Sequence, residues 1–141
     1  MIGVTPLPTV ITKGQTGPER STFDWNVQQS TAQTANRWAR RGASAWLNAI
    51  NCQVIVGSAV TLTKFSVKVY GTALATDSIT LVLQKNGVDT ALTVTLAAGA
   101  TSGTATGSVS VAAGDYLTVK ANQSGTESQT NYWIYILASD S

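Results

Sequence analysis

The stretch that decides the fold is "LQKNGVDTALTVTL", residues 83 to 96. Two runs in which apolar and polar residues alternate flank the pair Asn86 and Gly87. Because Asn and Gly tolerate the positive φ angles of a two-residue turn, this pair predicts a tight β-hairpin. The inward face of the returning strand is predicted to hold Val88, Leu92, Val94 and Leu96. The stretch therefore concerns folding, and nothing in it points to chemistry.

The strand pattern continues on both sides of the hairpin. In "VTLTKFSVKVY", residues 60 to 70, the apolar positions change parity between Leu62 and Phe65, which predicts a β-bulge near Thr63 and Lys64. Roughly six to eight short strands are expected, separated by turns, and no helical period occurs among them. The other residues predicted to face inward are Ile79, Leu81, Leu83, Val109, Val111, Leu117 and Val119. These features predict an all-β fold, a jelly-roll β-sandwich.

The closing strand, "NYWIYILA" at residues 131 to 138, has large apolar residues on both of its faces. A half-exposed strand would be polar on one face. Either a loop or the N-terminal segment covers a central strand, or the second face is a contact between subunits. We favour a subunit contact, because a small domain buries only part of its surface alone and aromatic residues are enriched at interface centres. The residues predicted to form this interface are Tyr132, Trp133, Tyr135 and Leu137.

The first 45 residues differ from the rest of the chain. They contain all three prolines, many Thr and Gln residues, and no sustained period. Such a segment does not fold alone, yet it carries large aromatic residues that are unfavourable in water. We therefore predict that residues 1–45 form an extended N-terminal arm that orders against another surface, and that residues 46–141 form the jelly-roll domain. The residues expected to make the contacts of this arm are Phe23, Trp25, Arg37, Trp38, Arg40 and Arg41.

The sequence around the arginines leaves alternatives open. "NRWARRGASAWLNAI", residues 36 to 50, fits either one short helix or an initial strand. The cluster of Arg37, Arg40 and Arg41 fits a solvated face, a dock for an acidic protein surface, or a nucleic-acid contact. Three arginines and a net charge of +2 are too few to track phosphates, so nucleic acid is not expected as a partner.

The chain lacks most of the residues on which catalysis depends. It has no histidine, a single cysteine, and seven carboxylates scattered among turn residues. The absence of histidine removes the usual general base and the commonest metal ligand. Asp115 with Glu127 would suit glycoside hydrolysis, and Asp77 with Asp89 would suit calcium, but turn chemistry explains these acids better. We expect no enzymatic activity, no catalytic or cofactor-binding residue, and no metal.

The sequence "LVLQKNGVDTALTVTLAAGATSGTATGSVSVAAGDYLTVKANQSGT", residues 81 to 126, resembles a domain common in structural proteins of tailed bacteriophages. The likeness is carried by "KNGVDTALTVT", the Ala/Gly/Thr-rich loop, "SVSVAAGD" and the closing hydrophobic strand. That domain is similar to the trimeric jelly roll of tumour-necrosis-factor and complement-head proteins. The resemblance implies a homotrimer, with Tyr132, Trp133 and Tyr135 near a symmetry axis or a seam between subunits.

In proteins of this kind the domain decorates or cements a capsid, or forms the tip of a fibre. We therefore expect a capsid decoration or cement protein that is made in the host cytoplasm and lies on the virion surface. It is expected to trimerise and, through the N-terminal arm, to clamp neighbouring subunits of the major capsid protein. The alternative is a head-fibre or tail-fibre tip that binds a host receptor or glycan. Its candidate residues would be Asp77, Asp89 and Asn122 with Tyr116 or Tyr70. No run of about 18 apolar residues is present, so a membrane partner is not expected.

Overall fold

The computed structural model describes residues 20–29, 37–38, 53–127 and 130–140. These residues form nine strands and their connecting turns, and no helix occurs among them. Every pairing between these strands is antiparallel. The prediction of an all-β fold is therefore confirmed. The choice between a helix and a strand for residues 36–50 lies outside the described residues, apart from a short strand at residues 37–38.

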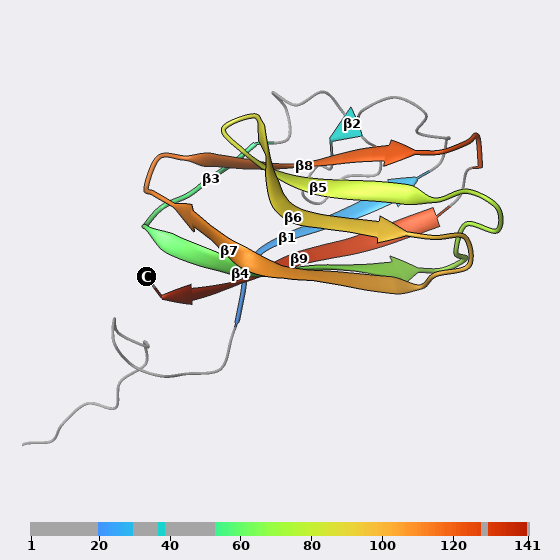
Figure 1. Ribbon diagram of the computed structural model, residues 1–141, viewed down its shortest axis with the longest axis horizontal. Coiled ribbons are helices and arrows are strands. Elements are labelled where there is room, and N and C mark those ends of the chain that lie inside the picture. The colour runs from blue at the N-terminus through green and yellow to red at the C-terminus, as the bar shows by residue number, and fades with distance from the viewer. Residues whose placement is uncertain (1–19, 30–36, 39–52, 128–129, 141) are drawn as a thin grey trace, which may run out of the picture.

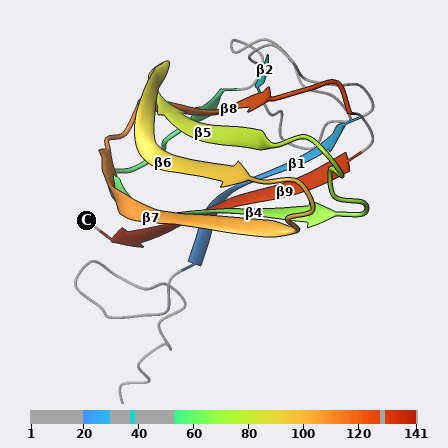
Figure 2. The ribbon, with the colours of Figure 1, turned by 45° about the vertical axis from the view of Figure 1, so that its right-hand side comes forward.

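The strands form two sheets that face each other (Figure 1, Figure 2). One of them, the β9 sheet, has the order β1-β9-β4-β7. It consists of β1 (Arg20–Gln29), β9 (Thr130–Asp140), β4 (Val60–Tyr70) and β7 (Ser102–Val111). The other, the β5 sheet, has the order β2-β8-β5-β6, and β3 also pairs with β8. It consists of β2 (Arg37–Trp38), β3 (Val54–Ile55), β8 (Tyr116–Gln123), β5 (Ile79–Lys85) and β6 (Val88–Leu96).

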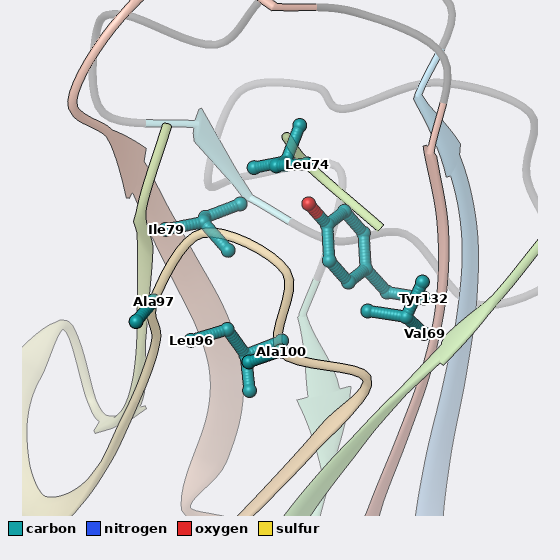
Figure 3. Close-up of a pocket in the computed structure, with 7 residues that line it drawn as sticks. All are labelled: Val69, Leu74, Ile79, Leu96, Ala97, Ala100 and Tyr132. Atoms are coloured by element: carbon teal, nitrogen blue, oxygen red, sulfur yellow. The ribbon is translucent and has the colours of Figure 1, made fainter. Parts of the chain in front are cut away.

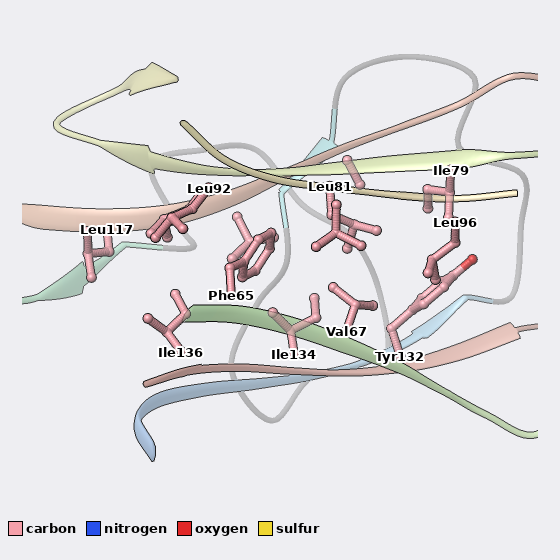
Figure 4. Close-up of a cluster of buried hydrophobic side chains, with 14 of the residues drawn as sticks. Phe65, Val67, Ile79, Leu81, Leu92, Leu96, Leu117, Tyr132, Ile134 and Ile136 are labelled. Carbon is pink, nitrogen blue, oxygen red and sulfur yellow. The ribbon is translucent and has the colours of Figure 1, made fainter. Parts of the chain in front are cut away.

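The core lies between the two sheets and is built from their alternate, inward-facing positions (Figure 4). β4 contributes Phe65 and Val67, and β9 contributes Tyr132, Ile134 and Ile136, all of them buried. Burial of each such side chain contributes roughly 1.5–3 kcal/mol relative to exposure. The predicted inward residues that are buried are Ile79, Leu81, Leu83, Leu92, Val94, Leu96, Val111, Leu117 and Val119, with Val109 partly buried against them. Alternation in the sequence therefore identified most of the core.

The turn at Asn86 and Gly87 joins β5 to β6 as predicted, since the two residues have φ angles of 51° and 81°. The prediction that Val88 faces the core is wrong, because its side chain is 69% exposed. Val88 has the inward parity, but it pairs with Lys85 in the last residue pair before the turn. That pair lies at the rim of the sandwich, where the Lys85 side chain is also 35% exposed. Parity alone does not reveal where a core ends.

Two irregularities lie beside each other in the β9 sheet. The register of β4 shifts between Leu62 and Lys64 against both of its neighbours, which confirms the predicted bulge. The register of β1 shifts at the same level of β9, between Ser21 and Phe23. The extra residue in β4 allows Leu62 and Phe65, which differ in parity, both to reach the core with 0% exposure.

Two of the nine strands come from the segment that we predicted to be an arm. Residues Arg20–Gln29 pair with β9 along the whole of β1, and Phe23 is partly buried against the core. Arg37 and Trp38 form β2, which pairs with β8. These parts of the segment belong to the sheets of the chain itself, because β1 alternates apolar and polar residues and completes one side of the sandwich. The rest of residues 1–45 lies outside the described residues.

Candidate interaction surface

The outer face of the β9 sheet is made of the positions that alternate with core residues along its four strands. These positions include Asn131, Trp133, Tyr135 and Leu137 on β9, Lys64, Ser66, Lys68 and Tyr70 on β4, Asp24 and Asn26 on β1, and Ser102, Thr104 and Thr106 on β7. The register aligns them in rows across the sheet. Trp133 pairs with Asn26 and Lys68, and Tyr135 pairs with Asp24 and Ser66. The backbone register therefore assigns Trp133 and Tyr135 to outer positions of a strand that has a neighbour on each side.

The described side chains of the outer face lie on β4 and β7. Ser66 is only 3% exposed, and its hydroxyl lies 3.1 Å from that of Thr104. Lys68 is exposed, and so is Tyr70, at 53%. The low exposure of a serine on the outer side of a sheet means that neighbouring atoms enclose it. Lys68 was not singled out from the sequence, because its place beside Trp133 depends on which strand neighbours β9.

The structure divides the four residues that were predicted to form the interface. Tyr132 belongs instead to the core of the chain itself, with 0% exposure, because it has the inward parity of β9 (Figure 3). The residues around its ring are Val69, Leu74, Ile79, Leu96, Ala97 and Ala100. Burial, and after it the charge of Glu127, raises the pKa of the Tyr132 hydroxyl. Positions 133, 135 and 137 have the opposite parity and remain candidates for contact.

Glu127, in the loop between β8 and β9, holds the loop between β4 and β5 at one end of the sandwich. Its carboxylate accepts hydrogen bonds from the backbone N–H groups of Ala75, Thr76 and Asp77, at 2.8, 2.8 and 2.7 Å. The Asp77 carboxylate in return accepts from the Glu127 N–H at 2.8 Å and from Gln123 Nε2 at 2.7 Å. The backbone donors lower the pKa of Glu127 to about 2. Both acids therefore serve as anchors for loops.

Asp115 has the same role at the other end of the sandwich. Its carboxylate accepts from the Ala112 N–H and from Asn86 Nδ2, both at 2.8 Å, and it pairs with Lys85 at 3.2 Å. The Ala112 N–H is the main cause that lowers its pKa, to about 2. Asp115 and Glu127 lie at opposite ends of β5, a strand of 7 residues, so roughly 20 Å separates them. Glycoside hydrolysis needs two carboxyl groups within about 5–10 Å, which this pair does not provide.

A second polar network occupies the outer side of the β5 sheet. Asp89 pairs with Lys120 at 2.6 Å and accepts from Gln84 Nε2 at 2.7 Å, and these two bonds lower its pKa. Gln84 Oε1 in turn accepts from the Thr118 hydroxyl at 3.1 Å. Gln84 and Thr118 are 6% and 1% exposed, so this network fixes the register between three strands. The polar groups of Asp89, Gln84, Thr118 and Lys120 thus have partners within the sheet itself.

The residues considered for glycan binding are not brought together. Asp77 is an anchor in the loop before β5, whereas Asp89 lies near the hairpin turn at the far end of that strand. Asn122 is exposed on the β5 sheet, and Tyr70 is exposed on the β9 sheet. Tyr116 lies beside the hairpin turn, where its N–H donates to Asn86 at 2.9 Å. These five residues therefore form no common surface within one chain.

The residues predicted to contact a capsid have different places in the chain. They divide between β1 (Phe23, Trp25), β2 (Arg37, Trp38) and the part outside the described residues (Arg40, Arg41). On β1, Trp25 pairs with Ile134, a core position of β9. These strand residues are therefore engaged in pairing within the chain.

Among the described residues, no three His, Cys, Asp or Glu side chains come together as metal ligands would. No helix in that part of the chain is long and apolar enough to cross a membrane. In comparisons with known proteins, neither a protein-family model nor a curated protein matches the chain.

Proposed function

We propose that this chain is a virion structural protein, a capsid decoration or cement protein that assembles as a homotrimer. The sandwich is proposed to be a jelly roll. In support, the strands pair in nested order, β1 with β9, β2 and β3 with β8, β4 with β7, and β5 with β6. Two antiparallel sheets built in this way are typical of jelly rolls. The phage-like sequence of residues 81–126 supports the same assignment.

The observation that carries the proposal is the composition of β9. This strand lies inside its sheet, between β1 and β4, and its core-facing residues are already buried. An isolated sandwich needs apolar residues only on the core side of such a strand. The alternate positions nevertheless hold Trp133, Tyr135 and Leu137. Covering each aromatic residue by a second copy would contribute roughly 1.5–3 kcal/mol, so the outer face is well suited to self-association.

Attachment to a capsid then follows from additive contacts. Three copies joined through their outer faces would present three identical sets of contacts to the major capsid protein. We assign these contacts to residues 1–19 and to Arg40 and Arg41. Linked contacts raise the effective concentration of one another, so modest individual affinities sum to a firm attachment.

The proposal is tested by binding to undecorated capsids of the virus that encodes the chain. The truncated protein should begin at Arg20, because a cut at residue 40 would remove β1 and uncover β9. Full-length protein is expected to sediment with the capsids, whereas the protein of residues 20–141 is expected to stay trimeric and remain in the supernatant. Capsids that bind no full-length protein, or that bind both proteins equally, would contradict the proposal.

Recognition of a glycan by a fibre tip has less support. The acids and tyrosines considered for it lie at opposite ends and on opposite faces of the sandwich, and Asp77 and Asp89 are engaged in bonds that hold loops and strands. Capsid decoration therefore remains the function that the geometry supports better.

A further inference from the structure

The outer face of the β9 sheet has an acidic position on one side of β9 and a basic position on the other. Lys68 lies on β4, exposed to solvent, in the row of Trp133. Within the part of the chain that the structure describes, Lys68 makes no ion pair. Asp24 lies on β1, in the row of Tyr135. Because β1 and β4 flank β9, the acidic and basic positions stand roughly 10 Å apart across the sheet, with the aromatic positions between them.

We propose that Asp24 of one copy pairs with Lys68 of the next copy across this face. The inference rests on the proposed function and names the partner of the outer face as a second copy of this chain. When identical subunits surround an axis through the same face, the β1 side of one subunit meets the β4 side of its neighbour. An acidic position on one side and a basic position on the other are then complementary in every contact of the ring.

The remaining residues of the face favour this pairing over others. Lys64, the second lysine of β4, is only partly exposed and already has a contact within its own chain. The outer positions of β7, which include Ser102, Thr104, Thr106 and Ser110, bring no charge to the side that faces the neighbour. Like charges that meet at an interface oppose binding, and complementary ones fix the register in which the partners meet. The pair would therefore fix which side of one subunit meets which side of the next, while the aromatic residues supply buried apolar area.

The test is a charge swap, with oligomer dissociation constants measured by sedimentation equilibrium at low salt. The variants are Asp24→Lys, Lys68→Asp and the double variant that exchanges the two charges. Thr93→Asp and Thr93→Lys are matched controls, because Thr93 is exposed on the outer side of the β5 sheet. Each single swap is expected to weaken the oligomer by about tenfold or more, and the double swap is expected to return it to within about threefold of the wild type. The controls should associate like the wild type.

Two outcomes would overturn the pairing while the wild type still assembles. Single variants as tightly associated as the wild type would do so, and so would a double variant no tighter than the single ones. Circular dichroism checks that each variant is folded. Salt supplies a measurement that needs no variant, because raising NaCl from about 0.05 M to about 1 M should weaken a wild-type oligomer held by this pair. A wild-type chain that is monomeric at low salt would instead contradict the proposed self-assembly itself.

Discussion

The protonation of Glu127 is expected to matter for the loop before β5. Its ordinary pKa of 4.5 falls to about 2 in the folded chain, because three consecutive backbone N–H groups donate to its carboxylate. A pKa that is lower in the folded state means that the stabilisation is present above pH 4.5 and is lost as the pH falls toward 2. The loop before β5 is therefore held by a charge that exists throughout the neutral range.

We predict that Glu127→Gln lowers the melting temperature at neutral pH by a few degrees. The loss of melting temperature between about pH 5 and about pH 2 should also be smaller in the variant than in the wild type, because the variant lacks the carboxylate that is protonated in this range. Calorimetry at a series of pH values measures both effects. Thr126→Gln is the matched control, because its side chain is exposed in the same loop. A Glu127→Gln protein that melts like the wild type at pH 7 would show that the carboxylate does not hold the loop.

At the scale of elements, β7 closes over β6 because it carries glycine where the two sheets come close. A Cβ at Gly103 would lie 2.7 Å from Val94 Cγ1 and 2.8 Å from Leu96 Cδ2, both buried core side chains of β6. A Cβ at Gly107 would meet Leu92 at 3.2 Å. The small residues of "SGTATGSVSV" therefore allow the edges of the two sheets to approach each other.

We predict that Gly103→Ala destabilises the fold by about 1–3 kcal/mol, because the added methyl group overpacks the contact with β6. The free energy of unfolding in urea measures this effect. Gly57→Ala is the control, since nothing lies within 4 Å of a Cβ built there. Equal unfolding free energies for the two variants would mean that β6 and β7 do not need this close approach.

The elements themselves were predictable where local pattern decides them. The hairpin at Asn86 and Gly87 and the bulge after Leu62 follow from turn chemistry and from a change of parity, which a few neighbouring residues specify. β1 also carries a local signal, since Phe23, Trp25 and Val27 alternate with polar residues. Because prolines lie nearby and the alternating run is short, the sequence pattern favours an arm over a strand for this segment.

Features that depend on sheet order could not be derived from one sequence. Placing Asp24 and Lys68 on either side of β9 requires knowing that β1 and β4 are its neighbours, and these strands lie far apart in the chain. For the same reason, the sequence could show that β9 is apolar on both faces, but not which of the two faces packs into the core of the chain. That face is the one that holds Tyr132. Pairing between strands that are distant in sequence decides both the neighbours of β9 and its core-facing side, and the local residue pattern contains no information on such pairing.

At the scale of the whole molecule, one sandwich supplies a complete core, and the outer positions of β9 hold a further aromatic band, Trp133 and Tyr135. The core needs no partner, because its residues from both sheets are buried within one chain. The band at Trp133 and Tyr135 is what a partner would cover. On the function proposed above, copies of the chain would join at this band before they attach to a capsid.

The most direct test of this conclusion is the mass of the full-length wild-type chain in dilute solution, measured by sedimentation equilibrium. We predict a species of three times 14.7 kDa that persists through micromolar concentrations and loses mass only on further dilution. A single species of 14.7 kDa at every concentration would contradict it, since the aromatic band of β9 would then have no copy to cover it.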